Sequence, residues 1–222
     1  MSFPAALAAS RLATLAISYY ISARRQLQAP SGTADSLTAL REKCRAAFLA
    51  SVDYLQVREK DLDARRLAGL VKELARMPER RRSRLLVNER ADVACAAGAD
   101  GLHLPSDSVP VAAVRSGIGK HWIVGVSCHN EQDVADAAAG GADYVLVGPV
   151  FETPSKPGAR GMGLSGLQSI CQRASIPVFA LGGVDLTNAA ACVAAGASGI
   201  AGIRLFQNAT DLTEVCRQIR SL

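Results

Sequence analysis

The feature that most constrains the fold is the regular alternation of short apolar runs with helical patterns along the whole chain. The expected strands cover residues 16–22, 52–58, 84–87, 100–104, 122–127, 143–147, 176–181 and 198–203. The helical patterns that follow them cover residues 34–50, 62–77, 91–97, 109–116, 131–139, 164–173, 186–195 and 212–221. Strands that alternate with helices in this way pair in parallel through right-handed crossovers. We therefore count eight strand-helix units.

A weak internal repeat supports this count. AAGADG ends at Gly101, AGGADY at Tyr144 and AAGASG at Gly199, and each places glycine where a helix stops and a polar residue where a strand starts. Eight units in 222 residues predict an α/β chain folded as a single (β/α)8 TIM barrel. We expect the barrel over residues 15–222, after an N-terminal extension at 1–14. An open doubly wound sheet is the alternative, but the GxGxxG fingerprint does not follow the first strand.

Charge and composition narrow the classes of partner. Hydrophobic residues make up 49% of the chain, enough for a substantial core, and the net charge is only +5. Much of the excess lies in Arg24, Arg25 and the run 76–84. Aromatic residues are only 5%, and no nucleic-acid recognition motif is present, so we expect no nucleic-acid partner. The basic run is then a solvated connection or an anion-attracting surface.

Cysteine usage and hydropathy indicate a reducing compartment. The six cysteines form no CxxC pair, which argues against a zinc cluster and a disulfide scaffold, and we expect them to act as small buried hydrophobes. Arg11 interrupts the apolar N-terminal stretch, and no basic region precedes it, unlike in a signal peptide. No uninterrupted apolar run is long enough to cross a membrane. We expect a cytoplasmic protein with no membrane partner.

Polar or flexible residues follow almost every expected strand. In a (β/α)8 barrel the active site is built at the carboxyl ends of the strands, so these residues should meet there. They are Gln56, Arg58, Lys60, Asn88, Glu89, His103, Asp107, Ser127, His129, Gly182, Gly183, Gly202 and Arg204. Taken singly, each has a structural explanation: a surface ion pair for Arg58 or Lys60, a core position for His103, a helix cap for Asn88, a turn for the two glycines. Together at one end of a barrel, they favour a binding site.

The longest expected loop, GPVFETPSKPGARGMG at residues 148–163, adds to this set. Loops of this length usually have a function. Thr153, Ser155 and Lys156 supply two hydroxyls and a charge, while its prolines limit backbone freedom and its glycines allow close approach. These residues suit a phosphate group, although a solvated surface loop would explain the segment alone.

The candidate residues divide by chemistry. The basic side chains Arg58, Lys60, Lys156 and Arg204, with the backbone N–H groups at Gly182 and Gly183, would surround phosphate groups. Glu89 and Asp107 offer oxygens for a Mg²⁺ ion that bridges a diphosphate. Gln56, Asn88 and His129 can hydrogen-bond a polar heterocycle or move protons. This combination predicts a small substrate that carries a diphosphate.

The segments LQVREK, NERADVACAAGADGLHL, GVSCHNEQDVADAAAGGADYVLVGPVFETPSKPG, IPVFALGGV and GASGIAG resemble the thiamine phosphate synthase / TenI family in order and spacing. For the synthase branch the resemblance implies transfer of hydroxymethylpyrimidine from its diphosphate to thiazole phosphate, with Mg²⁺ and basic residues holding the pyrophosphate that leaves. The positions that match the family's substrate contacts are Gln56, Arg58, Lys60, Asn88, Ser127, Thr153, Ser155, Lys156 and Gly183. We expect Lys60, Lys156 and His129 to be catalytic.

The metal positions depart from the synthase pattern. Glu89 stands where synthases carry aspartate, and Pro105-Ser106 and then Ser108 replace a Gly-Gln pair and an aspartate, with Asp107 one position early. These departures resemble the TenI branch, which isomerises a thiazole carboxylate phosphate without a metal and for which His129 is the acid/base candidate. A third possibility is a non-catalytic phosphate-binding relative with a regulatory role. We favour the synthase, with small phosphorylated substrates as partners and homo-oligomerisation left open.

Overall fold

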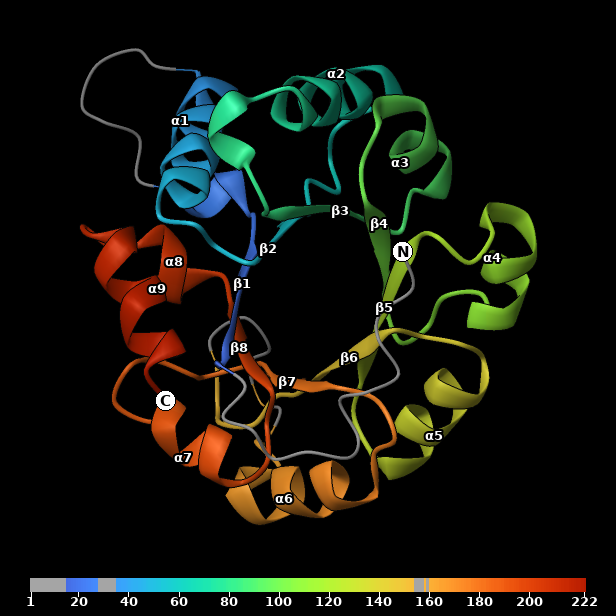
Figure 1. Ribbon diagram of the computed structural model, residues 1–222, viewed down its shortest axis with the longest axis vertical. Helices are drawn as coiled ribbons and strands as arrows, with labels where there is room; N and C mark the ends of the chain where they lie inside the picture. Colours follow the sequence, from blue (N-terminus) through green and yellow to red (C-terminus); the bar gives the residue numbers. More distant parts are fainter. Residues whose placement is uncertain (1–14, 28–34, 154–157, 159) are drawn as a thin grey trace.

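The computed structural model describes residues 15–27, 35–153, 158 and 160–222. A closed barrel of eight parallel strands lies at its centre, with helices around it (Figure 1). The strands are β1 (Ile17–Ile21), β2 (Tyr54–Val57), β3 (Arg84–Asn88), β4 (Gly101–Leu104), β5 (Ile123–Cys128), β6 (Tyr144–Val147), β7 (Val178–Ala180) and β8 (Gly199–Gly202). They pair in chain order, and β8 closes the sheet by pairing with β1. The predicted (β/α)8 barrel is confirmed, whereas the expected extension at 1–14 lies outside the described residues.

The helices confirm the predicted alternation as well. The longer ones are α1 (Ser36–Leu49), α2 (Ala64–Ala75), α3 (Ala91–Ala97), α4 (Val111–Ile118), α5 (Glu131–Ala139), α6 (Gly163–Arg173), α7 (Ala189–Ala194) and α9 (Leu212–Arg220). Three short elements were not predicted, because three or four residues carry no helical period: η2 (Arg24–Gln26), η3 (Pro78–Arg80) and α8 (Arg204–Gln207).

Local signals place the helix ends. The side chains of Asp63, Asn130 and Asp211 accept hydrogen bonds from backbone N–H groups in the first turns of α2, α5 and α9, which satisfies donors that have no partner within the helix. Gly98 ends α3 in the left-handed conformation, with φ 75°. The helix after β6 begins at Gly163, so a connection of fifteen residues (148–162) separates β6 from α6.

The hydrophobic core has two layers. The larger one lies between the strands and the helices, and a smaller cluster fills the barrel itself. Tyr19, Tyr54, Tyr144 and Phe179 dominate the inner cluster, and the ring centroids of Tyr144 and Phe179 are 5.1 Å apart. Gly125 makes room for this packing, since a Cβ atom there would lie 1.9 Å from the Tyr144 ring. The interior is therefore a packed core rather than a pore.

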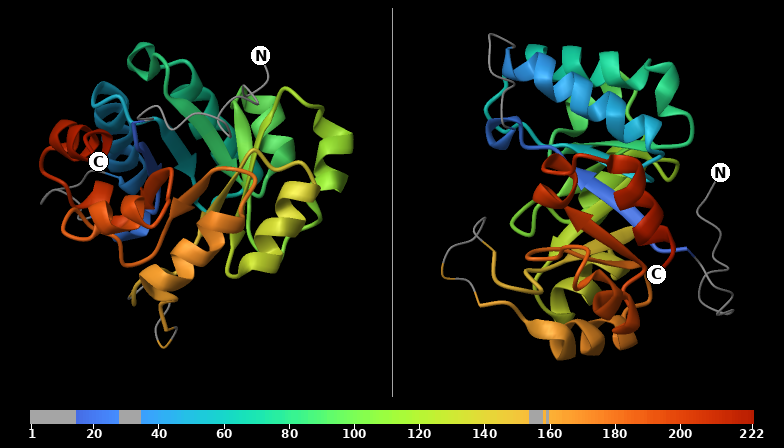
Figure 2. Two further views of the ribbon diagram at one scale, coloured as in Figure 1. Left: turned by 60° about the horizontal axis from the view of Figure 1, so that its bottom comes forward. Right: turned by 90° about the vertical axis from the view of Figure 1, so that its left-hand side faces the viewer.

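The parallel arrangement brings the carboxyl ends of all strands to one end of the barrel. Figure 2 shows the described parts of the β6–α6 connection, in yellow and orange, projecting from one end of the barrel.

Among the described residues, no helix is both long and apolar enough to cross a membrane. The cysteines are all free thiols, and Cys44, Cys128, Cys192 and Cys216 are buried as predicted. The prediction was wrong for Cys95, which is exposed on α3.

Candidate active site

A continuous chain of hydrogen bonds crosses the barrel interior below the carboxyl ends of the strands. We name it the polar chain, and its members in order are Ser127, His103, Tyr144, Tyr19, Gln56, Asn88 and Glu89. The six links have donor–acceptor distances between 2.8 and 3.0 Å. Strands β5, β4, β6, β1, β2 and β3 contribute its members, with Glu89 directly after β3. The polar chain thus joins five of the predicted site residues, Glu89 among them, with two tyrosines.

The donors of the polar chain all point in one direction. The Tyr19 hydroxyl donates to Gln56 Oε1, so Tyr19 must accept from the Tyr144 hydroxyl. Because the Tyr144 proton is used there, His103 Nδ1–H donates to Tyr144, and His103 Nε2 accepts from the Ser127 hydroxyl. At the other end Gln56 Nε2 donates to Asn88. The direction of the network thus fixes one tautomer of His103.

Burial keeps the polar chain uncharged between its ends. His103 is 2% exposed, and burial, together with the charge of Arg58, lowers its pKa to about 3. Burial also raises the pKa of Tyr19 and of Tyr144 well above 10. His103 is therefore a neutral imidazole at neutral pH, as the hydrogen-bond direction requires. Its structural explanation as a satisfied core histidine holds, and its expected role as a direct substrate contact stays a prediction.

The basic residues after β2 lie next to the Glu89 end of the polar chain. Lys60 Nζ is 3.8 Å from Glu89 Oε2, with both side chains about half exposed, so this surface pair contributes little to stability. Glu89 adopts φ 67°, a left-handed conformation that is rare for glutamate and is typical of functional sites. Asn88 does not cap the next helix, since α3 is preceded by Arg90 and the Asn88 amide bonds Gln56 and Glu89. The interpretation of Asn88 as a helix cap was therefore wrong.

A buried carboxylate holds the loop after β1 against the loop after β2. Glu59, 5% exposed, accepts hydrogen bonds from the Ser22 hydroxyl at 2.6 Å and from the Arg24 backbone N–H and Nη1 at 3.0 to 3.2 Å. Arg24 also makes two hydrogen bonds to Asp61, which lowers the pKa of that carboxyl. The Arg58 backbone N–H donates to the same Ser22 hydroxyl. We name this arrangement the Glu59 clasp; it fixes the backbone on both sides of Lys60.

The loops after β6, β7 and β8 approach one another on the opposite side of the barrel mouth. Arg204 Nη2 donates to Thr153 Oγ1 at 3.1 Å. Gly182 and Gly183 have φ values of 92° and 67°, and added Cβ atoms would meet Pro149 and Phe151 at 2.6 to 2.7 Å. These positions require glycine because the β6–α6 connection packs directly against them.

The remaining predicted residues on this side are at or beyond the strand ends. Gly202 is the last residue of β8, two positions before Arg204 begins α8. Ser155 and Lys156 lie outside the described residues, so their phosphate-binding role stays a prediction. The hydrogen bond between Arg204 and Thr153 orients the guanidinium, and their phosphate-binding role stays a prediction.

His129 lies at the rim between β5 and β6. Its Nδ1 hydrogen-bonds the carbonyl of Gly148, so that nitrogen is the donor. The Nε2 atom is 3.3 Å from Ser106 Oγ, which follows β4. In the neutral imidazole Nε2 is therefore the basic nitrogen, as a proton-transfer residue needs.

The proposed metal residues come from neighbouring strands. Asn88 pairs with His103 in the β3–β4 register, so Glu89 and Asp107 follow adjacent strand ends, and both are exposed. The part of the chain that the structure describes contains no cluster of three or more His, Cys, Asp or Glu residues suited to a metal. Mg²⁺, however, is typically bound by one or two carboxylates together with substrate phosphates. The donor set of Glu89 and Asp107 fits that mode.

Sequence reasoning missed the tyrosines and the Glu59 clasp. Tyr19 and Tyr144 occupy interior positions of their strands. The only sign of their role in the sequence is a tyrosine hydroxyl within an apolar run, which needs a hydrogen-bond partner when it is buried. Glu59 lies between the predicted site residues Arg58 and Lys60, and Ser22 and Arg24 follow β1. Their contacts join positions at least 35 residues apart, and no local pattern encodes such pairings.

Comparison with known proteins identifies the family of this chain. The thiamine monophosphate synthase family matches residues 29–206. A putative thiamine-phosphate synthase of Geobacter sulfurreducens is 41% identical over 79% of this chain and 83% of its own length. The thiamine-phosphate synthase of Chloroflexus aurantiacus is 42% identical over 82% and 84%. The solved thiamine phosphate pyrophosphorylase of Pyrococcus furiosus superimposes with a TM-score of 0.78 at 29% identity, covering 94% and 95% of the two chains. The chain belongs to the thiamine monophosphate synthase family.

Proposed function

We propose that this protein is a thiamine-phosphate synthase, which joins hydroxymethylpyrimidine diphosphate to thiazole phosphate and releases pyrophosphate. The names and identities of its relatives support the reaction class. The observation that carries the proposal is the row Gln56–Asn88–Glu89, in which two oriented amides lead to a carboxylate next to Lys60. The two amides can hydrogen-bond a heterocycle that carries donors and acceptors, and the charged end next to Lys60 can hold its diphosphate.

The residues of this row perform different parts of the reaction. The oriented amides of Gln56 and Asn88 hold the pyrimidine, and Arg58 and Lys60 stabilise the negative charge that develops on the leaving pyrophosphate. Glu89 and Asp107 would hold Mg²⁺, which supplies additional positive charge to the diphosphate. As the bond between the pyrimidine methylene carbon and the diphosphate oxygen breaks, negative charge accumulates on pyrophosphate, and the fixed cations lower this barrier. The thiazole ring nitrogen then bonds to the methylene carbon, so no covalent intermediate with the protein is needed.

A thiazole tautomerase is the second candidate, and one contact favours it. The His129 imidazole, with Nε2 as its basic nitrogen, lies next to Ser106 within the segment that departs from the synthase pattern. That arrangement can move a proton without a metal. If the protein is instead a non-catalytic, phosphate-binding relative, it should bind the ligand without turnover.

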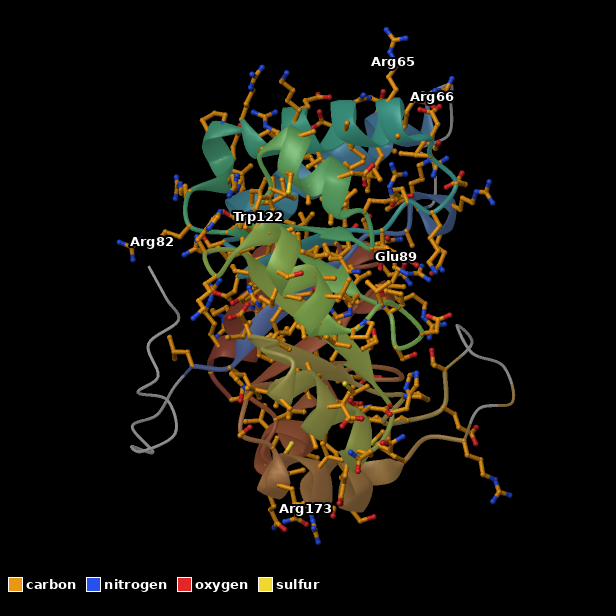
Figure 3. All side chains as sticks on the ribbon, turned by 90° about the vertical axis from the view of Figure 1, so that its right-hand side faces the viewer. Arg65, Arg66, Arg82, Glu89, Trp122 and Arg173 are labelled. Atoms are coloured by element: carbon orange, nitrogen blue, oxygen red, sulfur yellow. The ribbon has the colours of Figure 1, made fainter. Side chains whose placement is uncertain are left out.

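The deciding experiment is incubation of the protein with hydroxymethylpyrimidine diphosphate, thiazole phosphate and Mg²⁺, followed by detection of thiamine phosphate. Arg58→Ala should lower kcat/KM by roughly two orders of magnitude, because charged hydrogen bonds contribute about 1.5–3 kcal/mol each. Arg65→Ala, on the exposed outer side of α2, is the matched control and should retain activity (Figure 3). No thiamine phosphate, with metal-independent tautomer conversion that disappears in His129→Ala, would establish the tautomerase instead.

A further inference from the structure

A cavity lies at the amino-terminal end of the barrel. It has a volume of about 1070 Å³, and its lining includes Ile17, Tyr54, Arg84 and Ile123, which begin β1, β2, β3 and β5. Figure 3 shows Trp122 toward one end of the barrel and Glu89 toward the other. The cavity is thus separate from the candidate active site, and the proposed reaction makes no use of it.

The basic run of the sequence supplies much of the cavity wall. Arginines contribute four of the lining residues: Arg81, Arg82, Arg84 and Arg220. Within the described ranges Arg81 and Arg82 have no ion-pair partner, while Arg84 and Arg220 approach carboxylates only at 3.7 and 4.0 Å. Positive charge on a concave, partly apolar surface concentrates the local field and attracts anions.

The two carboxylates of the wall are already used by other groups. Asp100 Oδ2 accepts hydrogen bonds from the Leu85 backbone N–H at 2.6 Å and from Arg80 Nη2 at 2.5 Å. Asp53 Oδ2 accepts from the backbone N–H and the hydroxyl of Ser18, at 2.9 and 2.6 Å. These contacts bind the acids to the strands. Among the described residues Arg81 and Arg82 therefore line the cavity without a carboxylate partner, whereas Arg84 and Arg220 keep their long contacts to Asp100 and Asp53, and Arg220 Nη2 also donates to the carbonyl of Ser51.

Two aromatic side chains complete the wall. His121 and Trp122 both line the cavity, with ring centroids 5.9 Å apart and planes tilted by 51°. The Trp122 ring also packs against the outer core, which fixes its position. A flat, immobilised indole beside cationic side chains is a combination that binds a heterocyclic base through stacking and its phosphates through charge.

The backbone of the basic run supports a binding role. Arg81 has φ 45° and ψ −107°, outside the regions that residues other than glycine usually adopt. Such conformations persist where the surrounding structure imposes them, and they concentrate at ligand sites. Here the unusual conformation occurs in the turn that carries Arg81 and Arg82 to the cavity.

We propose that this cavity binds a nucleoside polyphosphate, with the base against Trp122 and His121 and the phosphates between the arginines. The ligand differs from the proposed substrates in class and occupies the opposite end of the barrel. The inference therefore does not rest on the proposed function, and it stands whichever reaction the active site performs.

Trp122 provides a direct test, because it is the only tryptophan in the chain. Titration of the full-length protein with ADP should change Trp122 fluorescence saturably, and ADP should bind more tightly than either adenosine or inorganic pyrophosphate. The double variant Arg82→Ala/Arg84→Ala should raise the Kd for ADP at least about tenfold. Arg173→Ala, an exposed arginine on α6, is the control and should leave the Kd unchanged.

A further variant separates the two ends of the barrel. Arg58→Ala should retain the full response to ADP if the ligand binds at the amino-terminal end. Loss of the response in Arg58→Ala would overturn the proposal, as would an unchanged Kd in the double variant. In Arg58→Ala, equal affinity for ADP and pyrophosphate in the Trp122 fluorescence response would also overturn it, since the aromatic wall would then contribute nothing.

Discussion

Replacing Tyr144 with phenylalanine breaks the polar chain at its centre. The variant removes one hydroxyl, which accepts from His103 Nδ1 at 3.0 Å and donates to Tyr19 at 2.9 Å. His103 then has a buried nitrogen without a partner in either tautomer, since Ser127 can satisfy only Nε2. A buried polar group left unsatisfied costs about 1–3 kcal/mol. Tyr144→Phe should therefore lower the free energy of unfolding by this amount.

The chain contains a matched control for this variant. Tyr54 belongs to the same interior cluster, 5.7 Å from the Tyr144 ring centroid, and within the described residues its hydroxyl makes no hydrogen bond. Tyr54→Phe removes the same atom from the same kind of ring, so it should change stability by less than about 0.5 kcal/mol. The difference between the variants isolates the hydrogen bonds from the effect of ring chemistry.

Urea unfolding followed by circular dichroism measures both variants. The midpoint for Tyr144→Phe should fall while the m-value stays constant, and its thermal midpoint should drop by roughly 2–4 °C for each kcal/mol lost in a domain of this size. Tyr54→Phe should resemble the parent protein. Equal midpoints for the two variants would refute the argument, because the polar chain would then contribute nothing that an isolated hydroxyl does not.

Three other predictions concern pH, metal and the Glu59 clasp. The pKa of His103 falls from 6.5 in the unfolded chain to about 3 in the folded protein, so its contribution to stability is complete above pH 6.5 and declines toward pH 3, by up to about 1.4 kcal/mol per pH unit. When the free energy of unfolding is measured with urea from pH 7 to pH 4, it should decline less steeply in His103→Gln than in the parent protein. Parallel curves would contradict this. EDTA should abolish thiamine phosphate formation, and added Mg²⁺ should restore it. The Mg²⁺ concentration that gives half-maximal activity should be about tenfold higher in Glu89→Gln. An unaltered concentration would remove Glu89 from the metal site. Glu59→Gln should lower kcat/KM roughly 5- to 50-fold, because it loosens Arg24. Glu73→Gln is the control: it alters the exposed pair with Arg41 and should leave kcat/KM unchanged. Equal activities of the two variants would show that the clasp does not position the site.

The strand-end residues were predictable because the fold itself brings them together. Once the alternation indicates a barrel, Asn88, His103 and Ser127 must lie near one another at the ends of β3, β4 and β5, whatever the details of packing. Their hydrogen bonds to Gln56 and the tyrosines required more than this. Topology specifies the end of the barrel at which a residue lies, but not the direction in which its side chain points.

The two adjacent tyrosines of β1 show why direction was not predictable. Strand alternation requires Tyr19 and Tyr20 to face opposite sides of the sheet, but both are equally aromatic, and the pattern does not indicate which one faces inward. In the structure Tyr19 enters the barrel and joins the polar chain, while Tyr20 packs outward against Phe206, with ring centroids 5.7 Å apart. The choice depends on the register with β2 and β8, which only the closed sheet determines.

Glu89 replaces the aspartate expected in synthases, and its position explains how the replacement can be accommodated. Its carboxylate accepts from Asn88 Nδ2 at 3.0 Å while lying 3.8 Å from Lys60, so it connects the amides that we assign to the pyrimidine with the cations that we assign to the diphosphate. Glutamate reaches one methylene farther than aspartate, and the left-handed backbone at φ 67° redirects the side chain at the point where β3 ends. These features set where the Glu89 carboxylate lies. Its metal-binding role stays a prediction, which the Mg²⁺ requirement of Glu89→Gln tests.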